Sequence, residues 1–300
     1  MFAADEFLDG THALDNGTVY ALLDTEYVGQ RYNNCAKNLT YPYCYQLSIS
    51  LAVSHDWGLT WKHALPPPHN LVATVPYVYN MSHISYGWGA PSIVESPTDG
   101  YIYMIMWNKH DIGLQKGGLS VARTAHINEP ASWRGLDKSG EFTVSYVSPY
   151  TMTPGTESDH VSEIVNLPHN CAPHGLTYST KLGKFVVSLC CYDSWQTENP
   201  RLRDGGGSSM ATFLFATSPD MITWSETTRF FNTTSDLPAN ISAMVTGKMY
   251  PSLFDPKEAA ARGDRNFGVI GAEPWLYWVS IGHSPYSDGR HLWATPVDFE

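Results

Sequence analysis

The chain reads Ser54-His55-Asp56-Trp57-Gly58-Leu59-Thr60-Trp61 directly after an alternating run, residues 46–53, that predicts a strand. In this octet the carboxylate of Asp56 can accept backbone N–H groups that follow it, and Gly58 can adopt positive φ without a Cβ clash. The serine and threonine hydroxyls can close further local hydrogen bonds, and the last tryptophan brings a large ring to bury in the next strand. The octet therefore predicts a tight turn between two strands.

Weaker copies of this pattern recur downstream. Residues 213–224 keep the strand together with Ser218, Asp220 and Trp224, but they lack the glycine. Residues 119–124 and then 130–133 keep a strand and a tryptophan around a longer turn, and residues 291–297 look like the same strand again. An internal repeat of this size predicts a propeller or an array of similar units.

The octet resembles the Asp box of sialidases and of other propellers built from bacterial neuraminidase repeats. The residues that carry the resemblance match every fixed position of S-x-D-x-G-x-T-W, and they are Ser54, Asp56, Gly58, Thr60 and Trp61. The resemblance implies that the turn joins the third and fourth strands of a propeller blade. Because local hydrogen bonding accounts for its residues, we expect the Asp box and its second copy to be structural.

Each repeat is predicted to begin with a hairpin of apolar strands. The first joins residues 9–14 to 18–23 through Asn16-Gly17, the strongest short hairpin signal. The others are predicted at 90–95 with 101–106, at 173–178 with 184–189, and at 250–255 with 275–280, the last with a helical turn at 256–261. These four units of four antiparallel strands predict a single all-β propeller domain over residues 1–300.

The hairpin pattern also resembles that of five-bladed propellers of the glycosidase families. We therefore expect five blades, of which four are recognisable here while sequence before Met1 supplies the rest. A six-bladed, sialidase-like propeller is the alternative.

The net charge and the lengths of the apolar runs limit the kinds of binding partner that we expect. The net charge of -11 argues against a nucleic acid or an anionic membrane as a partner, because either would need a basic face. No apolar run approaches the ~20 residues needed to cross a bilayer, so no membrane insertion is expected. Nothing at Met1 resembles a signal peptide, and we expect any such segment to be removed or to lie upstream.

Sequons and cysteines indicate the compartment. Cys35 and Cys44 bracket one polar loop, which favours a disulfide across it. Cys171 and the pair Cys190-Cys191 lie near the two ends of one predicted hairpin, and the odd count leaves one thiol over. Five sequons begin at Asn16, Asn38, Asn80, Asn232 and Asn240. Together these features predict a secreted or extracellular glycoprotein.

The predicted blade topology places a ligand site on the face opposite the Asp-box turn. In a four-stranded antiparallel blade the start of strand one and the end of strand two share a face, and the Asp-box turn lies on the opposite face. On the first face we expect the candidate catalytic carboxylates Glu26, Asp24, Asp193 and Asp9. Substrate-binding candidates on the same face are His12, Tyr27, Trp88, Trp107, Asn108, His110, His174, Tyr192, Trp195 and Tyr250. Carboxylates, histidines and aromatic rings around one funnel are typical of a sugar site.

Glycoside hydrolysis needs one protonated and one ionised carboxyl about 5 to 10 Å apart. Asp24 and Glu26 share one strand parity, about 7 Å apart, and can raise each other's pKa. Glycosidases of this type usually draw the pair from different blades, which favours Glu26 with Asp193 or Asp9 with Asp193.

The activity that we expect is limited by what two families, sialidases and five-bladed arabinanases and xylosidases, require of their site residues. A sialidase needs three arginines on the substrate carboxylate and an opening Arg-Ile-Pro motif, which is absent here, so sialidase activity is disfavoured. The five-bladed arabinanase and xylosidase type needs three acids on innermost strands. Asp9 fits one of these positions, but Ala90 and His174 stand where the other two acids are expected.

Metal sites are weaker hypotheses. His169, Cys171 and His174 with Cys190 or Cys191 could bind zinc, but an extracellular protein favours a disulfide. Asp159, His160 and Glu163 could bind a structural calcium ion or form a polar loop. No cofactor and no metal at the site are expected.

The function predicted is a secreted carbohydrate-active propeller that acts as a glycoside hydrolase on a glycan or polysaccharide, with paired carboxylates opposite the Asp-box turns. The alternative is a non-catalytic propeller that binds carbohydrate or assembles with other chains of an extracellular glycoprotein.

Overall fold

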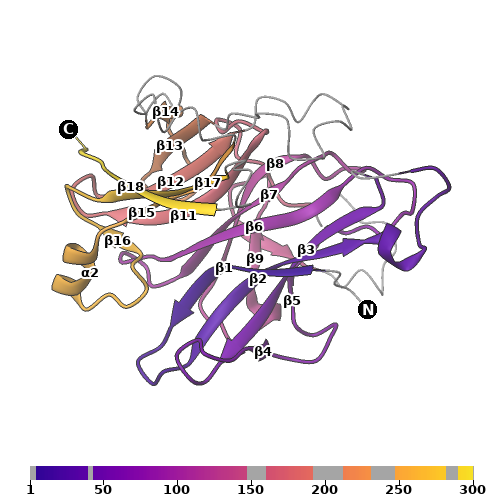
Figure 1. Cartoon of the computed structure of the whole chain (residues 1–300), viewed down its shortest axis with the longest axis horizontal. Helices are drawn as coiled ribbons and strands as arrows, with labels where there is room; N and C mark the ends of the chain where they lie inside the picture. Colours follow the sequence, from indigo (N-terminus) through magenta and orange to yellow (C-terminus); the bar gives the residue numbers. More distant parts are fainter. Residues whose placement is uncertain are drawn as a thin grey trace. The chain divides into compact units, whose positions relative to one another are not determined.

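Strands dominate the computed structural model, which describes residues 5–39, 43–146, 160–191, 212–230, 247–281 and 290–299 (Figure 1). The predicted all-β class is confirmed. The chain divides into two compact units, Met1–Val165 and Asn166–Glu300. Since such a division can fall between blades of one propeller, the single domain over residues 1–300 stays a prediction.

The first blade of the unit Met1–Val165 is an antiparallel meander. Its strands are β1 (Asp5–Ala13), β2 (Val19–Val28) and β3 (Tyr45–Ser54), with the short β4 (Lys62–His63) and β5 (Leu71–Ala73) both paired to β3. The turn between β1 and β2 uses Gly17 at φ 87, a conformation that glycine adopts without strain. A 3₁₀ turn, η1 (Gly29–Tyr32), follows β2.

The second blade of this unit repeats the meander. Its elements are β6 (Tyr86–Glu95), β7 (Ile102–Asn108), β8 (Gly118–Thr124), η2 (Pro130–Ser132), β9 (Arg134–Leu136) and β10 (Phe142–Ser145). A short parallel pairing of Gln46 and Leu47 in β3 with Tyr86 and Gly87 in β6 connects the two blades.

Side chains from both blades form one hydrophobic core in this unit. The largest fully buried rings are those of Tyr86, Trp88 and Trp133, and they pack with Met104 and Met106 of β7. Alternate residues of a strand point to the same face, so every second residue of β7 reaches this core. Burial of these apolar surfaces is the main term that holds the two blades together.

The unit Asn166–Glu300 contains two further antiparallel sheets. One consists of β11 (Cys171–Ser179), β12 (Lys184–Cys191), β13 (Thr212–Ser218) and β14 (Thr228–Arg229), with β16 (Val269–Ile270) parallel to β11. The other consists of β15 (Gly247–Phe254), β17 (Trp275–Ile281) and β18 (Arg290–Pro296). The four predicted hairpins are therefore present as β1–β2, β6–β7, β11–β12 and β15–β17.

The helical turn expected in the last hairpin is α2 (Pro256–Arg262). The Asp255 side chain caps it by accepting N–H groups of Lys257 and Glu258, at 3.1 and 3.0 Å, and its other oxygen accepts the Gly271 N–H at 3.0 Å. Proline at the first helical position and an aspartate cap before it are a strong helix start. The carboxylate thus connects the helix to the chain that returns toward β17.

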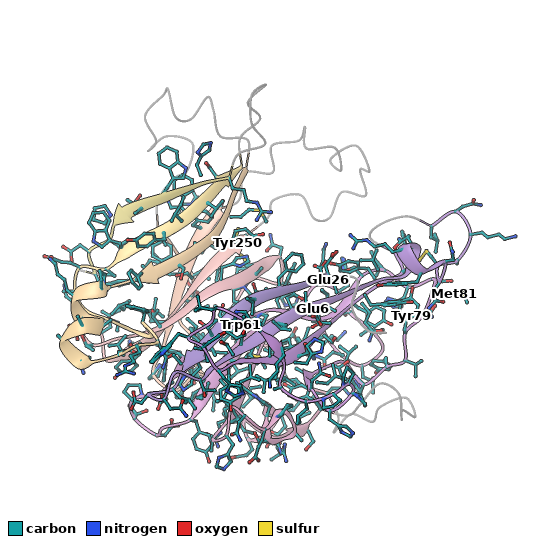
Figure 2. The ribbon with its side chains drawn as sticks, turned by 60° about the horizontal axis from the view of Figure 1, so that its bottom comes forward. Glu6, Glu26, Trp61, Tyr79, Met81 and Tyr250 are labelled. Atoms are coloured by element: carbon teal, nitrogen blue, oxygen red, sulfur yellow. A yellow bond between two sulfur atoms is a disulfide. The ribbon has the colours of Figure 1, made fainter. Side chains whose placement is uncertain are left out.

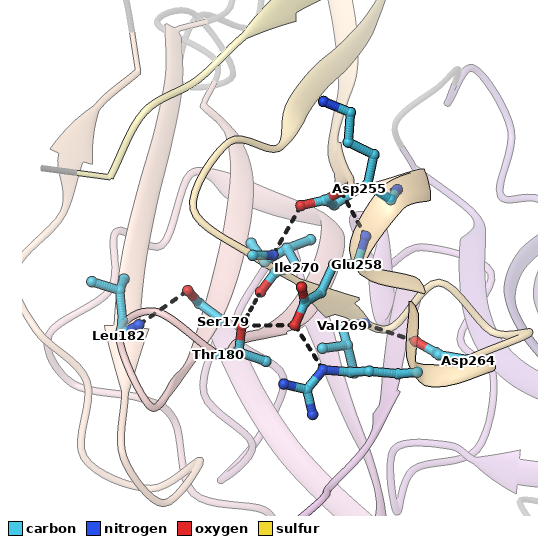
Figure 3. A network of polar contacts seen from close by, with 11 residues as sticks. Ser179, Thr180, Leu182, Asp255, Glu258, Asp264, Val269 and Ile270 are labelled. Carbon is cyan, nitrogen blue, oxygen red and sulfur yellow. Dashed lines mark hydrogen bonds and ion pairs between the residues drawn. The ribbon is translucent and has the colours of Figure 1, made fainter. Parts of the chain in front are cut away.

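A second contact fastens α2 to the β11–β12 hairpin (Figure 3). Glu258 Oε1 accepts hydrogen bonds from the Thr180 hydroxyl at 3.0 Å and from Arg262 Nε at 2.7 Å. These two bonds lower the pKa of Glu258, so the carboxylate stays charged. The insert is therefore anchored to the sheet of β11–β14.

The Asp-box octet forms a closed turn at the end of β3. Asp56 accepts the Ser54 hydroxyl at 2.6 Å, the Thr60 hydroxyl at 2.6 Å and the Thr60 N–H at 2.9 Å, and these bonds lower its pKa to about 2. The Gly58 N–H donates to Ser54 Oγ at 2.8 Å, and Trp61 packs on a small cluster of β2 and β3 residues. Local bonding accounts for the turn, as the sequence predicts.

The second copy closes a similar turn without the glycine, through a partly different set of hydrogen bonds to its aspartate. Asp220 accepts the Ser218 hydroxyl at 3.2 Å and the N–H groups of Ile222 and Thr223 at 2.9 and 2.7 Å. The residue after each aspartate takes a left-handed conformation, with φ 60 at Trp57 and φ 66 at Met221. Trp224 is buried and donates its indole N–H to the Met221 carbonyl at 3.0 Å.

Candidate carboxylate site

In each of the four described hairpins the first strand has a bulge a few residues before its end. The register with the next strand shifts between Leu8 and Gly10 in β1, Gly89 and Ser92 in β6, Pro173 and Gly175 in β11, and Met249 and Ser252 in β15. The residues at the bulges are Asp9, Ala90 with Pro91, His174, and Tyr250 with Pro251. Bulges of this kind redirect a side chain and are common next to active sites.

Three predicted carboxylates come together in the unit Met1–Val165. Burial and the charge of Glu26 raise the pKa of Asp9 to about 7, although the residue keeps an exposed surface. Burial, together with the charges of Asp9 and Glu26, raises the pKa of Asp24 to about 8. Burial also raises the pKa of Glu26. At neutral pH this cluster therefore holds protons that ordinary aspartates and glutamates have lost.

Asp24 is the most enclosed of the three carboxylates. Its Oδ2 accepts the bulged N–H of Ala90 at 3.1 Å, and its Oδ1 is buried with no hydrogen-bond partner in the described part of the chain. A Cβ at Gly89 would lie 3.0 Å from both carboxylate oxygens of Asp24. A larger residue at position 89 would therefore crowd this carboxyl group. Asp24 thus reaches from the first blade to the bulge of the second.

Glu26 has both basic and acidic side chains close enough to change its pKa. The Tyr45 side chain hydrogen-bonds to it, and the charges of Arg31 and Lys109 lower its pKa while Asp5 raises it. Arg31 itself pairs with Asp5, its Nη1 lying 2.7 Å from Oδ2. Burial lowers the pKa of Lys109 to about 7. The balance makes Glu26 the member of the cluster with the most support for an ionised form.

The carboxylates and the Asp box lie at opposite ends of the first blade. In the β2–β3 register Val28 faces Tyr45 and Val19 faces Ser54. Glu26 is thus close to the start of β3, while the Asp box begins at its end, roughly 20 Å away at 3.3 Å per residue. Glu26 and Trp61 are both labelled in Figure 2.

Three of the predicted binding residues are enclosed instead of lining an open site. Trp88 has no exposed surface and belongs to the core cluster, and Trp107 is 8% exposed. Asn108 is fully buried, accepts the Gly87 N–H at 3.0 Å and donates to the Lys116 carbonyl at 3.0 Å. A sugar ring cannot stack on Trp88 in this arrangement, so the assignment of that ring to substrate binding is corrected to a core position.

The remaining candidates in this unit differ in how far their side chains are buried. His12 is buried, with its Nε2 3.9 Å from a carboxylate oxygen of Glu95. Burial and the neighbouring Lys109 lower the pKa of His110 to about 4, so that ring stays neutral. Tyr27 stacks on Tyr32 in a cluster at the end of β2.

In the unit Asn166–Glu300 the structure brings two predicted residues together. The rings of His174 and Tyr250 meet edge to face, with centroids 4.9 Å apart. Burial lowers the pKa of His174 to about 4, and its Nε2 is buried with no hydrogen-bond partner in the ranges described. Tyr250 is 37% exposed and holds φ 61 at its bulge. Asp193, Tyr192 and Trp195 lie outside the described residues, so their placement stays a prediction.

Two disulfides join Cys35 to Cys44 and Cys171 to Cys191. The second occupies Cys171 of the zinc hypothesis, while Cys190 is buried and takes part in neither bridge. Within the described ranges no group of three or more His, Cys, Asp or Glu side chains could hold a metal ion, and no helix is long and apolar enough to span a membrane. Of the calcium candidates, Asp159 is outside the described residues, and His160 Nε2 lies 2.7 Å from the Tyr77 hydroxyl.

Three sequon asparagines, Asn16, Asn38 and Asn80, are exposed. The sequons at Asn232 and Asn240 lie outside the described residues.

Several members of the cluster are not among the residues that the sequence predicts. Lys109 directly follows the predicted residues Trp107 and Asn108 at the end of β7, and this adjacency is the signal that could identify it. Asp5, Arg31 and Tyr45 carry no motif, and only the pairing of Asp5 with Glu26 and of Val28 with Tyr45 brings them to the site.

Comparison with models of protein families finds no match, and comparison with curated protein sequences finds none either. Solved structures do match. An α-L-arabinanase of Cellvibrio cellulosa, solved as a point mutant, is 10% identical with a TM-score of 0.52 over 98% of this chain and 73% of that chain. The endo-1,5-α-L-arabinanase of Thermotoga petrophila is 11% identical with a TM-score of 0.49 over 95% of this chain and 55% of that one. The α-L-arabinofuranosidase of Lactobacillus brevis is 11% identical with a TM-score of 0.48 over 95% and 70%.

At such low identity the likeness shows the fold alone. With the repeated bulged meanders, it gives the chain a β-propeller fold of the kind found in glycoside hydrolases. The number of blades stays a prediction, and the resemblance to sialidases continues to rest on the Asp-box octet.

Proposed function

We propose that the chain is a carbohydrate-active propeller that hydrolyses glycosidic bonds with the carboxyl groups of the first blade. The observation that carries this proposal is the cluster of Asp9, Asp24 and Glu26, in which burial raises all three pKa values and the charge of Glu26 adds to the rise at Asp9 and Asp24. Hydrolysis of a glycoside needs one carboxyl that keeps its proton near neutral pH and one that is ionised. The cluster supplies both states.

In the proposed reaction Asp9 acts as the general acid and Glu26 as the general base. Asp9, with a pKa of about 7 and an exposed surface, donates a proton to the leaving glycosidic oxygen as the bond from that oxygen to the anomeric carbon breaks. Glu26, which Lys109 and Tyr45 favour as a carboxylate, accepts a proton from the water that adds to the anomeric carbon. Asp24, whose pKa is raised to about 8 by burial and then by the charge of Asp9, keeps its proton at neutral pH. Asp193 remains a candidate partner for either role.

The disulfides and the exposed sequons support an extracellular location for the protein. Two disulfides are stable in an oxidising environment, and exposed sequons at Asn16, Asn38 and Asn80 are accessible to glycosylation. These features support a secreted or extracellular protein whose partner is a glycan or polysaccharide.

The test is a rate measurement on arabinan, on other plant and algal polysaccharides and on synthetic arylglycosides. We expect Glu26→Gln and Asp9→Asn each to lower kcat by at least 100-fold. Glu6→Gln is the matched control, because Glu6 is a carboxylate on β1, the strand of Asp9, but lies outside the cluster. Its two carboxylate oxygens lie 3.0 and 3.1 Å from His63 Nε2. Full activity in both cluster variants would remove this site from catalysis.

One observation favours a second candidate function, a propeller that binds carbohydrate without cleaving it or that assembles with other extracellular chains. Ala90 and His174 occupy bulges where the arabinanase type would place acids. Binding of a polysaccharide with no turnover on any substrate of the panel would favour this candidate.

A further inference from the structure

The β7–β8 loop, residues 109–117, begins beside the carboxylate site. Asp24 accepts the Ala90 N–H, so β2 and β6 are in contact at this level. Because β2 is antiparallel to β3 and β3 is parallel to β6, β2 and β6 run in opposite directions. Glu26, two residues beyond Asp24, therefore reaches the β6 position that pairs with the last residue of β7. Lys109 is the next residue along the chain and the first of the loop.

The charge of Lys109 favours the ionised form of Glu26. Burial lowers the pKa of Lys109 to about 7, and the charge of Glu26 opposes that change, so the lysine is charged below about pH 7. A buried ammonium group gains free energy by moving into water, and its long methylene chain lets it turn outward when the backbone can move. The position of the loop backbone therefore decides how much of this charge acts on Glu26.

Gln115 ties this loop to the chain that follows β10. The residue has no exposed surface. Its Oε1 accepts the Val161 N–H at 3.1 Å, and its Nε2 donates to the Val161 carbonyl at 3.1 Å. The same Nε2 donates to the Lys116 carbonyl at 3.2 Å, which also accepts Asn108 Nδ2 at 3.0 Å. The Lys116 carbonyl thus joins Gln115 to the residue that precedes Lys109.

A tyrosine holds the tip of the same loop. The Tyr77 hydroxyl accepts the Leu114 N–H at 2.8 Å and lies 2.7 Å from His160 Nε2. A Cβ at Gly113 would collide with this hydroxyl, so the tyrosine packs directly against the loop. Gly113 has φ 54, a conformation that glycine adopts without strain. The loop is therefore fastened to the segment before β6 and to the segment after β10.

We propose that Gln115 is a positioning residue that holds Lys109 beside Glu26 through the β7–β8 loop, with Tyr77 in support. The inference rests on the proposed function for the role of Glu26 as general base. It makes the electrostatics of that base depend on a buried amide whose hydrogen bonds go to backbone groups.

Other titratable groups also act on Glu26 or lie on the loop. Those that interact with Glu26 from other elements are Asp5, Asp9, Asp24, Arg31 and Tyr45. Those on the loop itself are His110, Asp111 and Lys116. A shift in Glu26 that any of these groups causes would persist after the charge of Lys109 is removed, and this distinction decides the design of the test.

The titration of the Glu26 carboxyl, followed by ¹³C NMR on the labelled full chain, tests the inference without any substrate. Gln115→Met keeps the length of the side chain but loses its hydrogen bonds to Val161. We expect it to raise the midpoint of the Glu26 titration by about one pH unit, as Lys109→Met should do directly. Adding Gln115→Met to Lys109→Met should cause no further shift, because two changes that act through one group are not additive.

Two other variants make the comparison specific. Ser132→Ala is the control, because Ser132 Oγ donates to the carbonyls of His126 and Glu129 in the loop at the opposite end of β8, and we expect an unchanged midpoint. Tyr77→Phe loses the hydroxyl that holds the loop tip and should shift the midpoint less, in the same direction. It replaces Gln115→Met in the same comparison if that variant does not fold.

Hydrolysis gives a separate readout. If Glu26 is the general base, the acid limb of kcat/KM against pH moves with the NMR midpoint in Gln115→Met. A shifted midpoint with no hydrolysis by the wild type, or with an unmoved acid limb, would overturn the proposed function and leave the positioning role in place. An unchanged midpoint in Gln115→Met and Tyr77→Phe, a shift that persists in the Lys109→Met background, or an equal shift in Ser132→Ala would each overturn the positioning role.

Discussion

Replacing Asp24 by asparagine removes a carboxyl whose ionisation the fold opposes. In the folded chain its pKa is raised from 3.8 to about 8, chiefly by burial and then by the charge of Asp9. Between these two values the unfolded chain ionises while the folded chain keeps the proton, so wild-type stability falls as the pH rises through this window. Below pH 4 the carboxyl is protonated in both states and costs nothing.

The size of the effect follows from the shift. About 4 pK units correspond to roughly 6 kcal/mol at 1.36 kcal/mol per unit. Asparagine keeps an oxygen for the Ala90 N–H, and Asp9 and Glu26 lose a charged neighbour in the variant. Because rearrangement of these groups relieves part of the wild-type cost, we expect Asp24→Asn to be more stable by about 2 to 4 kcal/mol at pH 9 and about equal at pH 4.

Chemical unfolding of both proteins across pH 4 to 9 measures this difference, with the slope against denaturant as a check on the unfolded state. The same variant should lose activity if Asp24 serves the site, since functional groups often cost stability. Identical pH dependence of the two unfolding curves would refute the view that Asp24 is held protonated by burial.

Three further predictions address the core, the reaction and the disulfide. Trp88→Ala should lower the free energy of unfolding by about 3–5 kcal/mol, as truncation of a fully buried ring does, and Trp88→Phe by less; calorimetry checks both. Hydrolytic rate should fall about tenfold per pH unit above about pH 7, because Asp9 then loses the proton that it donates to the leaving oxygen, and a rate that stays flat to pH 10 would exclude this acid. The paired replacement Cys171→Ala with Cys191→Ala should cost about 2–4 kcal/mol in urea unfolding, whereas Cys190→Ala should leave the disulfide intact by mass spectrometry.

Much of the fold could be predicted from local signals. Asn16-Gly17 specifies its own hairpin, alternating runs give the strands, and the Asp56 turn is determined by bonds within eight residues. The helix start at Asp255-Pro256 is equally local. Such features need no knowledge of distant contacts, so sequence reasoning finds them.

The site could be predicted only in part. The parity of Asp24 and Glu26 correctly brings their charges together. The position of a residue near a strand end predicts at which end of the blade it lies but not which face of the strand its side chain takes. For this reason Trp88 is predicted to bind substrate, although its side chain lies in the core. Lys109 and the Ala90 N–H reach the cluster through packing between blades, and no local pattern encodes that.

The carboxyl titrations of Asp9, Asp24 and Glu26, followed by ¹³C NMR on labelled protein, test the physical claim independently of any substrate. We predict one carboxyl that titrates at about pH 7 and one at about pH 8, and only the titration at about pH 8 should be absent in Asp24→Asn. Three carboxyls that all titrate near pH 4 would contradict the account, since no proton would then remain on the cluster at neutral pH for acid catalysis.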